Sequence, residues 1–142
     1  MKSRRVVVTG MGALTPIGNN LKDYWRALQD GVSGAAPITH FNAENFKTQF
    51  ACELKDFDVT DFMHRKEARK MDLFCQYAMV ASDEAIKDSG LNLDEVNLDR
   101  AGVIWGSGIG GMKSFQQETS NFAQGNGIPR YNPFFIPKLI SD

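Results

Sequence analysis

The chain has few of the residues that build metal sites and disulfides. Its 142 residues include two cysteines, Cys52 and Cys75, and two histidines, His40 and His64. None of the four stands at a metal-ligand spacing or in a CxxC motif. A nucleophilic thiolate needs a cationic or helix-N-terminal setting, so both cysteines are interpreted as packing residues. We therefore expect no metal, no disulfide and no cofactor.

A long apolar run and a strong net charge are also missing. No stretch approaches the ~20 apolar residues that cross a bilayer. The basic N-terminus is followed only by Val6, Val7 and Val8 before Thr9, which is too short for a signal peptide. The net charge of −1 gives no general attraction to nucleic acid or to anionic membranes. We therefore expect a cytoplasmic protein that binds neither nucleic acid nor membrane.

Two apolar runs predict strands. One covers residues 5–9, and the other, Val103, Ile104 and Trp105, leads directly into a glycine-rich turn and is expected to be buried. Helical patterns separate the two runs, which favours an α/β fold with a mainly parallel sheet. Two strands make a poor sheet, and the C-terminal residues are unusually apolar. We therefore expect the chain to be part of a larger unit.

Apolar residues at helical spacing predict three helices. They are expected at residues 21–28, at about residues 65–89 and at residues 112–124. Asn19 or Asn20 is expected to cap the first helix, and Gly31 to follow its end. The apolar stripe of the long helix is mostly small, so another element is expected to approach it closely. Residues 32–62 are expected to be irregular, with short strands possible at 48–54.

The glycine-rich turn, Gly-Ser-Gly-Ile-Gly-Gly at residues 106–111, matches the GxGxxG pattern of a dinucleotide-binding turn. That pattern also needs an acidic residue about twenty positions later, and residues 126–135 contain none. We favour a close-packed turn beside an apolar pocket, with Ile109 as its one bulky apolar side chain. Nucleotide binding is the less favoured alternative.

Residues 64–70 hold four basic residues and one acid. On a helix, Lys66, Arg69 and Lys70 would share one face. Cations near the start of a helix oppose its macrodipole, and such a cost is easier to understand if the face binds an acidic partner. A solvated helix face is the alternative interpretation.

Five segments together resemble the elongating β-ketoacyl-acyl carrier protein synthases, most closely the type II enzyme of bacterial fatty acid synthesis. The segments are RRVVVTGMG at 4–12, TPIG at 15–18, RKEARKMD at 65–72, GSGIGG at 106–111 and NPFFIP at 132–137. Each is weak alone, but they occur in family order along the whole chain, and jointly they are specific.

The resemblance implies a thiolase-like layered fold of two related α/β halves, and residues 1–142 would form most of the N-terminal half. It also implies the decarboxylative Claisen condensation of an acyl thioester with malonyl-acyl carrier protein, carried out by a cysteine and two histidines. None of these three lies in this chain. We therefore expect no catalytic residue here, and no activity from the chain alone.

The resemblance further implies a site for the acyl group. Gly108 and Ile109 would lie at the acyl pocket, with Ile109 limiting chain length. Phe135, together with Phe134, would reach the pocket across a homodimer interface. This assignment agrees with the rigid, proline-framed setting of the two phenylalanines.

The docking surface for the carrier protein follows from the same resemblance. Lys66, Arg69 and Lys70, with Arg130 added, would bind the acidic acyl carrier protein, whose phosphopantetheine arm delivers acyl and malonyl groups. A non-catalytic subunit, similar to the chain-length factors of polyketide synthases, is the alternative from another functional class.

Overall fold

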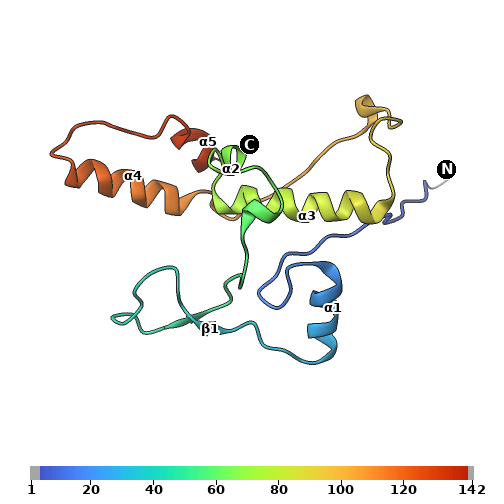
Figure 1. The fold of residues 1–142 in the computed structure, drawn as a ribbon, viewed down its shortest axis with the longest axis horizontal. Helices are drawn as coiled ribbons and strands as arrows, with labels where there is room; N and C mark the ends of the chain where they lie inside the picture. Colours follow the sequence, from blue (N-terminus) through green and yellow to red (C-terminus); the bar gives the residue numbers. More distant parts are fainter. Residues whose placement is uncertain (1–3, 141–142) are drawn as a thin grey trace. The chain divides into compact units, whose positions relative to one another are not determined.

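The computed structural model describes residues 4–140 (Figure 1). These residues fall into two compact units. The first unit comprises the residues up to Phe57 together with Val80–Val96. The second comprises Asp58–Met79 and the residues from Asn97 onward. Helix α3 (Leu73–Ser89) therefore contributes its beginning to the second unit and its remainder to the first.

In the first unit, helix α1 (Leu21–Gln29) begins and ends at the predicted signals. The Asn20 side chain accepts a hydrogen bond from the backbone N–H of Asp23 at 2.8 Å, which identifies Asn20 as the N-cap. Gly31, just past the end, has a φ of +64°, a conformation that glycine adopts without strain. Asn19 instead donates to the Lys55 carbonyl at 2.8 Å.

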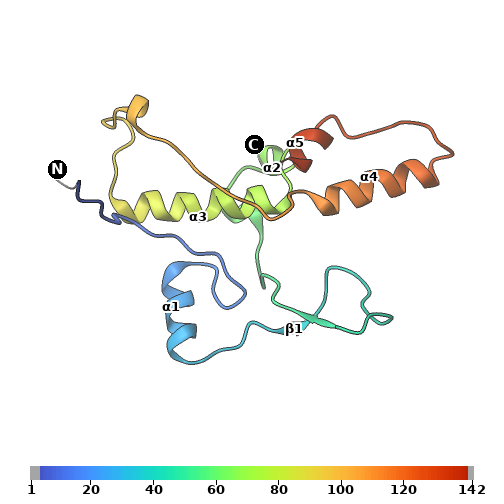
Figure 2. The same cartoon turned by 180° about the vertical axis from the view of Figure 1, so that it is seen from behind.

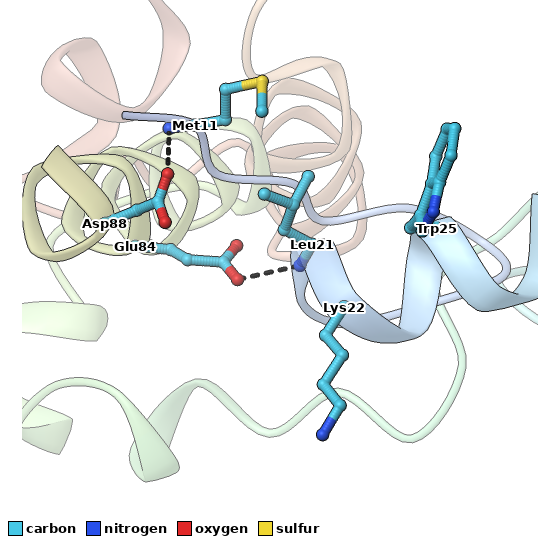
Figure 3. Close-up of a pocket in the computed structure, with 6 residues that line it drawn as sticks. All are labelled: Met11, Leu21, Lys22, Trp25, Glu84 and Asp88. Atoms are coloured by element: carbon cyan, nitrogen blue, oxygen red, sulfur yellow. Dashed lines mark hydrogen bonds between the residues drawn. The ribbon is translucent and has the colours of Figure 1, made fainter. Parts of the chain in front are cut away.

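Two carboxylates of α3 hold the segment that precedes α1. Glu84 accepts hydrogen bonds from the backbone N–H groups of Ala13 and Leu21, both at 2.8 Å, and Asp88 accepts one from Met11 at 2.9 Å. Figure 3 shows the bonds to Leu21 and Met11. A Cβ on Gly12 would overlap the Ala81 carbonyl oxygen. The expected close approach of another element to the small-residue stripe is therefore confirmed.

The sheet in the described residues is small and antiparallel. Strands β1 (Ala36–Pro37) and β2 (Phe50–Ala51) pair with Ala36 opposite Ala51, and β2 lies within the range where short strands were predicted. Glu53 extends this pairing, because its carboxylate accepts hydrogen bonds from the Thr39 hydroxyl at 2.7 Å and from the Thr39 N–H at 3.0 Å.

The second unit is mostly helical. Its other helices are η1 (Val59–Asp61), α2 (Arg65–Ala68), η2 (Leu98–Arg100), α4 (Met112–Gln124) and α5 (Phe135–Leu139). Helix α4 has the bounds that were predicted for it, whereas α5 was not predicted. Helix α5 packs against α4, and both views show α5 beside the N-terminal end of α4 (Figures 1 and 2). No helix in the described part of the chain is long and apolar enough to span a bilayer.

The long helix expected from residue 65 is broken into α2 and α3. Residues 69–72 form a turn between them, in which the Lys70 N–H bonds to the Glu67 carbonyl at 2.9 Å. Asp72, the residue directly before α3, accepts a hydrogen bond from the Leu73 N–H at 2.6 Å. The Gln76 amide holds the two helices together by donating to the Ala68 carbonyl at 2.9 Å.

The two predicted strands are not formed in the described residues. Residues 5–9 and 103–105 have no ladder partner there. Val6 is 92% exposed and Ile104 fully exposed, so the prediction of a buried strand before the glycine turn is wrong. A strand depends on backbone partners elsewhere in the chain, and these runs meet none among residues 4–140.

Candidate functional site

The glycine turn is close-packed at its second half. Gly110 has a φ of +93°, and a Cβ there would overlap the Leu139 carbonyl oxygen of α5. A Cβ on Gly111 would overlap the Lys138 carbonyl oxygen, and the Gly111 N–H donates to the Leu139 carbonyl at 3.1 Å. These contacts explain the glycines by the close approach of two backbone segments.

The first half of the turn is open. No atom lies within 4 Å of where a Cβ on Gly106 or Gly108 would sit. Ile109 is 77% exposed, so the described residues do not enclose it in a pocket. The second half of the turn is thus fixed, and the Ile109 side chain projects from it. The acyl-pocket role of Gly108 and Ile109 stays a prediction.

Phe135, the first residue of α5, stacks within a row of four aromatic rings. Its ring centroid lies 5.7 Å from that of Tyr131 and 6.3 Å from that of Phe115. Tyr131 stacks in turn on Phe122 at 5.8 Å. Phe115 and Phe122 belong to α4, so the row ties α5 and the preceding loop to that helix.

Phe134 has a different environment. It occupies the N-cap position of α5, is 40% exposed, and donates its backbone N–H to the Asn132 side chain at 2.9 Å. The structure therefore separates the phenylalanine pair into a stacked ring and an exposed one. The sequence reasoning missed Tyr131, although an aromatic residue directly before the Asn-Pro-Phe-Phe segment was a usable signal.

The predicted basic residues are exposed, but they do not share a helical face. Lys66 lies in α2, Arg69 is its C-cap and Lys70 follows in the turn. The macrodipole argument from the sequence fails with that helix, because α2 has four residues and Lys66 lies in its last turn. The cause is the helix break at residues 69–72.

The charges in this segment are not equally available. Lys70 forms an ion pair with Glu67 at 2.8 Å. Hydrogen bonds from Thr60 hold the pKa of Asp58 below its usual value, and the nearby Arg65 guanidinium adds to this effect. Lys66 and Arg69 form no ion pair with the described residues. We call these two the free cations; Arg65 also forms no ion pair with the described residues, but it lies near the Asp58 carboxylate.

Arg130 lies in the loop after α4, apart in sequence from the other basic residues. It borders a cavity of about 280 Å³ together with Phe122 and Ile128, and it too forms no ion pair with the described residues. Its guanidinium is exposed and available to an anionic group.

Asp72 is a second residue of this unit, after Tyr131, that sequence reasoning did not single out. One carboxylate oxygen accepts from the Leu73 N–H, and the other accepts from the Ser114 N–H at 3.3 Å and from the Ser114 hydroxyl. The carboxylate thus occupies the N-terminus of α4, where a dinucleotide-binding turn would hold its phosphate. This arrangement argues against the nucleotide-binding alternative.

Cys75 is half-buried in α3. Burial raises the pKa of its thiol, and the nearby Asp72 carboxylate raises it further. The thiol is therefore protonated near neutral pH, which agrees with a packing role. The described residues hold no group of three or more metal-binding side chains.

An apolar cavity of about 440 Å³ lies in the first unit (Figure 3). It is bordered by Met11, Leu21, Lys22, Trp25, Glu84 and Asp88. Its two carboxylates already accept backbone hydrogen bonds, and none of the predicted site residues borders it. We assign this cavity no catalytic role.

Solved structures of similar fold are ketosynthases. One, "The ishigamide ketosynthase/chain length factor", matches with a TM-score of 0.81 and 29% identity over 96% of this chain and 34% of that chain. Another, a type II polyketide acyl-carrier protein in complex with its ketosynthase, matches with a TM-score of 0.75 and 28% identity over 97% of this chain and 35% of that chain. The chain thus has the thiolase-like fold of these ketosynthases over about a third of their length.

The family described as "Beta-ketoacyl synthase, N-terminal domain" matches residues 3–141. The chain belongs to this family, which confirms the predicted family and fold class. The 3-oxoacyl-[acyl-carrier-protein] synthase 2 of Synechocystis sp. is 46% identical over 142 residues, which are 100% of this chain. That of Vibrio harveyi is 49% identical over 140 residues, or 99% of this chain. The chain spans 34% of the length of each.

Proposed function

We propose that the chain is the N-terminal part of a 3-oxoacyl-[acyl-carrier-protein] synthase of fatty acid elongation. The observation that carries this proposal is the 46–49% identity, along the whole chain, to curated relatives with that name. In the complete protein, an acyl group would be held as a thioester on a cysteine outside these residues. Loss of CO₂ from malonyl-carrier protein would yield the carbanion that attacks the acyl carbonyl. A carbon–carbon bond forms, and the cysteine thiolate leaves.

Within this reaction, the glycine turn would supply part of the acyl pocket. An acyl chain needs an apolar wall whose position does not change when the chain enters. The contacts of Gly110 and Gly111 with α5 fix the base of the turn, and Ile109 projects from it largely uncovered. In a homodimer, Phe134 of the second copy has the exposure needed to reach such a wall, whereas the Phe135 ring is already stacked on Tyr131.

The free cations would supply the docking surface for acyl carrier protein. Lys66 and Arg69 are exposed and unpaired within the described residues, so an acidic partner need not displace an existing ion pair. Arg130 adds a guanidinium from another segment. The similar solved structure in which a type II polyketide acyl-carrier protein is bound to its ketosynthase supports the same kind of partner. The cytoplasmic location stays a prediction.

A condensation assay tests this proposal. The longest polypeptide that the gene encodes is incubated with acyl- and malonyl-carrier protein, and the 3-oxoacyl product is measured by mass spectrometry. We expect product from that polypeptide, and none from residues 1–142 alone because neither Cys52 nor Cys75 has the setting of a nucleophile. Absence of product from the former, or condensation by the latter, would contradict the proposal.

A non-catalytic, chain-length-factor-like subunit is the second candidate, favoured by the structural match to a ketosynthase/chain length factor. The residue at the nucleophile position of the complete protein separates the two candidates. A cysteine there means a condensing enzyme, whereas another residue means a binding subunit. The polypeptide is incubated with carrier protein that bears an acyl group, and its mass is then measured by mass spectrometry. A condensing enzyme would gain the mass of the acyl group, whereas a binding subunit would stay unmodified.

A further inference from the structure

Asp72 lies between the two parts of the proposed site. It follows Lys70 by two residues and immediately precedes α3. Its carboxylate accepts from the Leu73 N–H at 2.6 Å on one side and from Ser114, in the first turn of α4, on the other. One side chain therefore joins the start of α3 to the start of α4, across 42 positions of sequence.

Helix α4 needs this carboxylate because its own N-cap has no side chain. Gly111 occupies the N-cap position and makes no side-chain capping bond. A larger residue cannot stand there, because its Cβ would overlap the Lys138 carbonyl oxygen and would lie 3.1 Å from the Asp72 carboxylate. The turn thus requires a glycine, and the cap comes from elsewhere in the chain.

The contacts on the two sides of Gly111 fix the turn that carries Ile109. Its N–H donates to the Leu139 carbonyl of α5 at 3.1 Å, while Asp72 holds Ser114 three residues later. Asp72 also follows directly on the segment that bears Lys66 and Arg69. The Gln76 side chain fixes that segment by donating a hydrogen bond to the Ala68 carbonyl. The turn and the basic segment are therefore held in one hydrogen-bonded arrangement.

We propose that Asp72 is a positioning residue. It sets the place of the Ile109 turn relative to the segment bearing Lys66 and Arg69, and thereby the acyl-chain length that the enzyme accepts. This inference rests on the proposed function, since it concerns the same acyl pocket. Asp72 itself does not contact the substrate.

The main test is Asp72→Asn in the longest polypeptide that the gene encodes, assayed with acyl-carrier proteins of two chain lengths. Asparagine has the same size as aspartate, but its side-chain nitrogen donates and cannot accept. It therefore replaces one of the two acceptors of Asp72, either the one that faces the Leu73 N–H or the one that faces Ser114. We expect the ratio of kcat/KM for the long and short substrates to change by about tenfold, the lower end of the discrimination that a hydrophobic pocket exerts per methylene. A merely destabilised protein would lose both activities together.

Three further variants sharpen the test. Asp83→Asn removes an equal charge from α3, the helix that Asp72 precedes. Asp83 is exposed and among the described residues pairs only with Lys87, at 2.6 Å, so the ratio should stay that of the wild type. Ser114→Ala removes the hydroxyl donor to Asp72 and should shift the ratio in the same direction as Asp72→Asn. Ser114→Thr retains a hydroxyl and should restore the wild-type ratio.

A second measurement does not depend on condensation. Amide hydrogen exchange over residues 107–114 should be faster in Asp72→Asn than in the wild type, and unchanged in Asp83→Asn. Unchanged exchange, or an unchanged substrate ratio in an active Asp72→Asn enzyme, would overturn the inference. Absence of condensation by the wild type would instead overturn the proposed function, and the exchange measurement would still decide whether Asp72 holds the turn.

Discussion

Gly111→Ala places a methyl group where the structure has the carbonyl oxygen of Lys138. The backbone of α5 or of the turn must move to make room, and such overpacking typically costs about 1–3 kcal/mol. That movement also weakens the 3.1 Å hydrogen bond from Gly111 to Leu139, for about 1 kcal/mol more. We therefore expect the free energy of unfolding to fall by about 2–4 kcal/mol.

The assay is thermal unfolding of the variant beside the wild type. At about 3 °C per kcal/mol for a chain of this size, Tm should fall by about 6–12 °C. Gly106→Ala is the matched control, because no atom lies within 4 Å of its added Cβ. Its effect should stay within about 0.5 kcal/mol. Equal melting temperatures for the two variants would refute the packing of the turn on α5.

Three other predictions concern the docking charges, the acyl wall and the β1–β2 pairing. Reversing Lys66 and Arg69 to Glu should weaken carrier-protein binding about tenfold, because two surface ion pairs contribute up to ~1 kcal/mol each. Lys47→Glu is the control and should leave the affinity unchanged. If the loss of affinity did not depend on salt concentration in a titration series, the electrostatic cause would be contradicted. Ile109→Phe should shorten the acyl chains accepted in the condensation assay, and an unchanged length profile would remove Ile109 from the pocket wall. The hydrogen bond from the Thr39 side chain lowers the pKa of Glu53, with smaller contributions from the Thr39 and His40 N–H groups and from the His40 charge, against a partial opposing effect of burial. Glu53 therefore stabilises the fold above its unfolded pKa, and this contribution is lost as pH falls through its folded pKa. Tm measured from roughly pH 7 to pH 3 should fall less steeply for Glu53→Gln than for the wild type, and identical slopes would contradict this.

Helix ends with local signals were predicted correctly. Asn20 caps α1 through a hydrogen bond to a residue three positions away, and Gly31 follows with the expected positive φ. Both features depend on a few neighbouring residues, so the sequence contains the information that sets them. The same holds for α4, whose apolar periodicity predicted its bounds.

The helix break before Asp72 carries a weaker signal. Neither proline nor glycine occurs between Arg65 and Ser89, and the apolar stripe continues through the break. The available sign is Asp72 itself, because aspartate favours N-cap positions over helix interiors. Its second role, as the cap of α4, depends on a residue 42 positions away and could not be read from local sequence.

The strands show the limit of local reasoning most clearly. Val6–Val8 and Val103–Trp105 have the β-branched and aromatic residues that favour strands, but neither segment has a ladder partner in the described residues. Composition specifies which segments can pair, whereas pairing itself depends on long-range backbone contacts. The family resemblance, which rests on five separated motifs, identified the fold class that the strand count alone could not.

The GxGxxG match shows why a motif needs its structural context. In a dinucleotide-binding turn, the free N–H groups at the helix N-terminus bind phosphate. Here the Gly111 N–H donates to Leu139, and the Ser114 N–H donates to Asp72. A phosphate would have to displace both acceptors and approach a carboxylate of like charge. The same glycines therefore serve backbone packing, and this packing leaves Ile109 as the side chain that the turn presents.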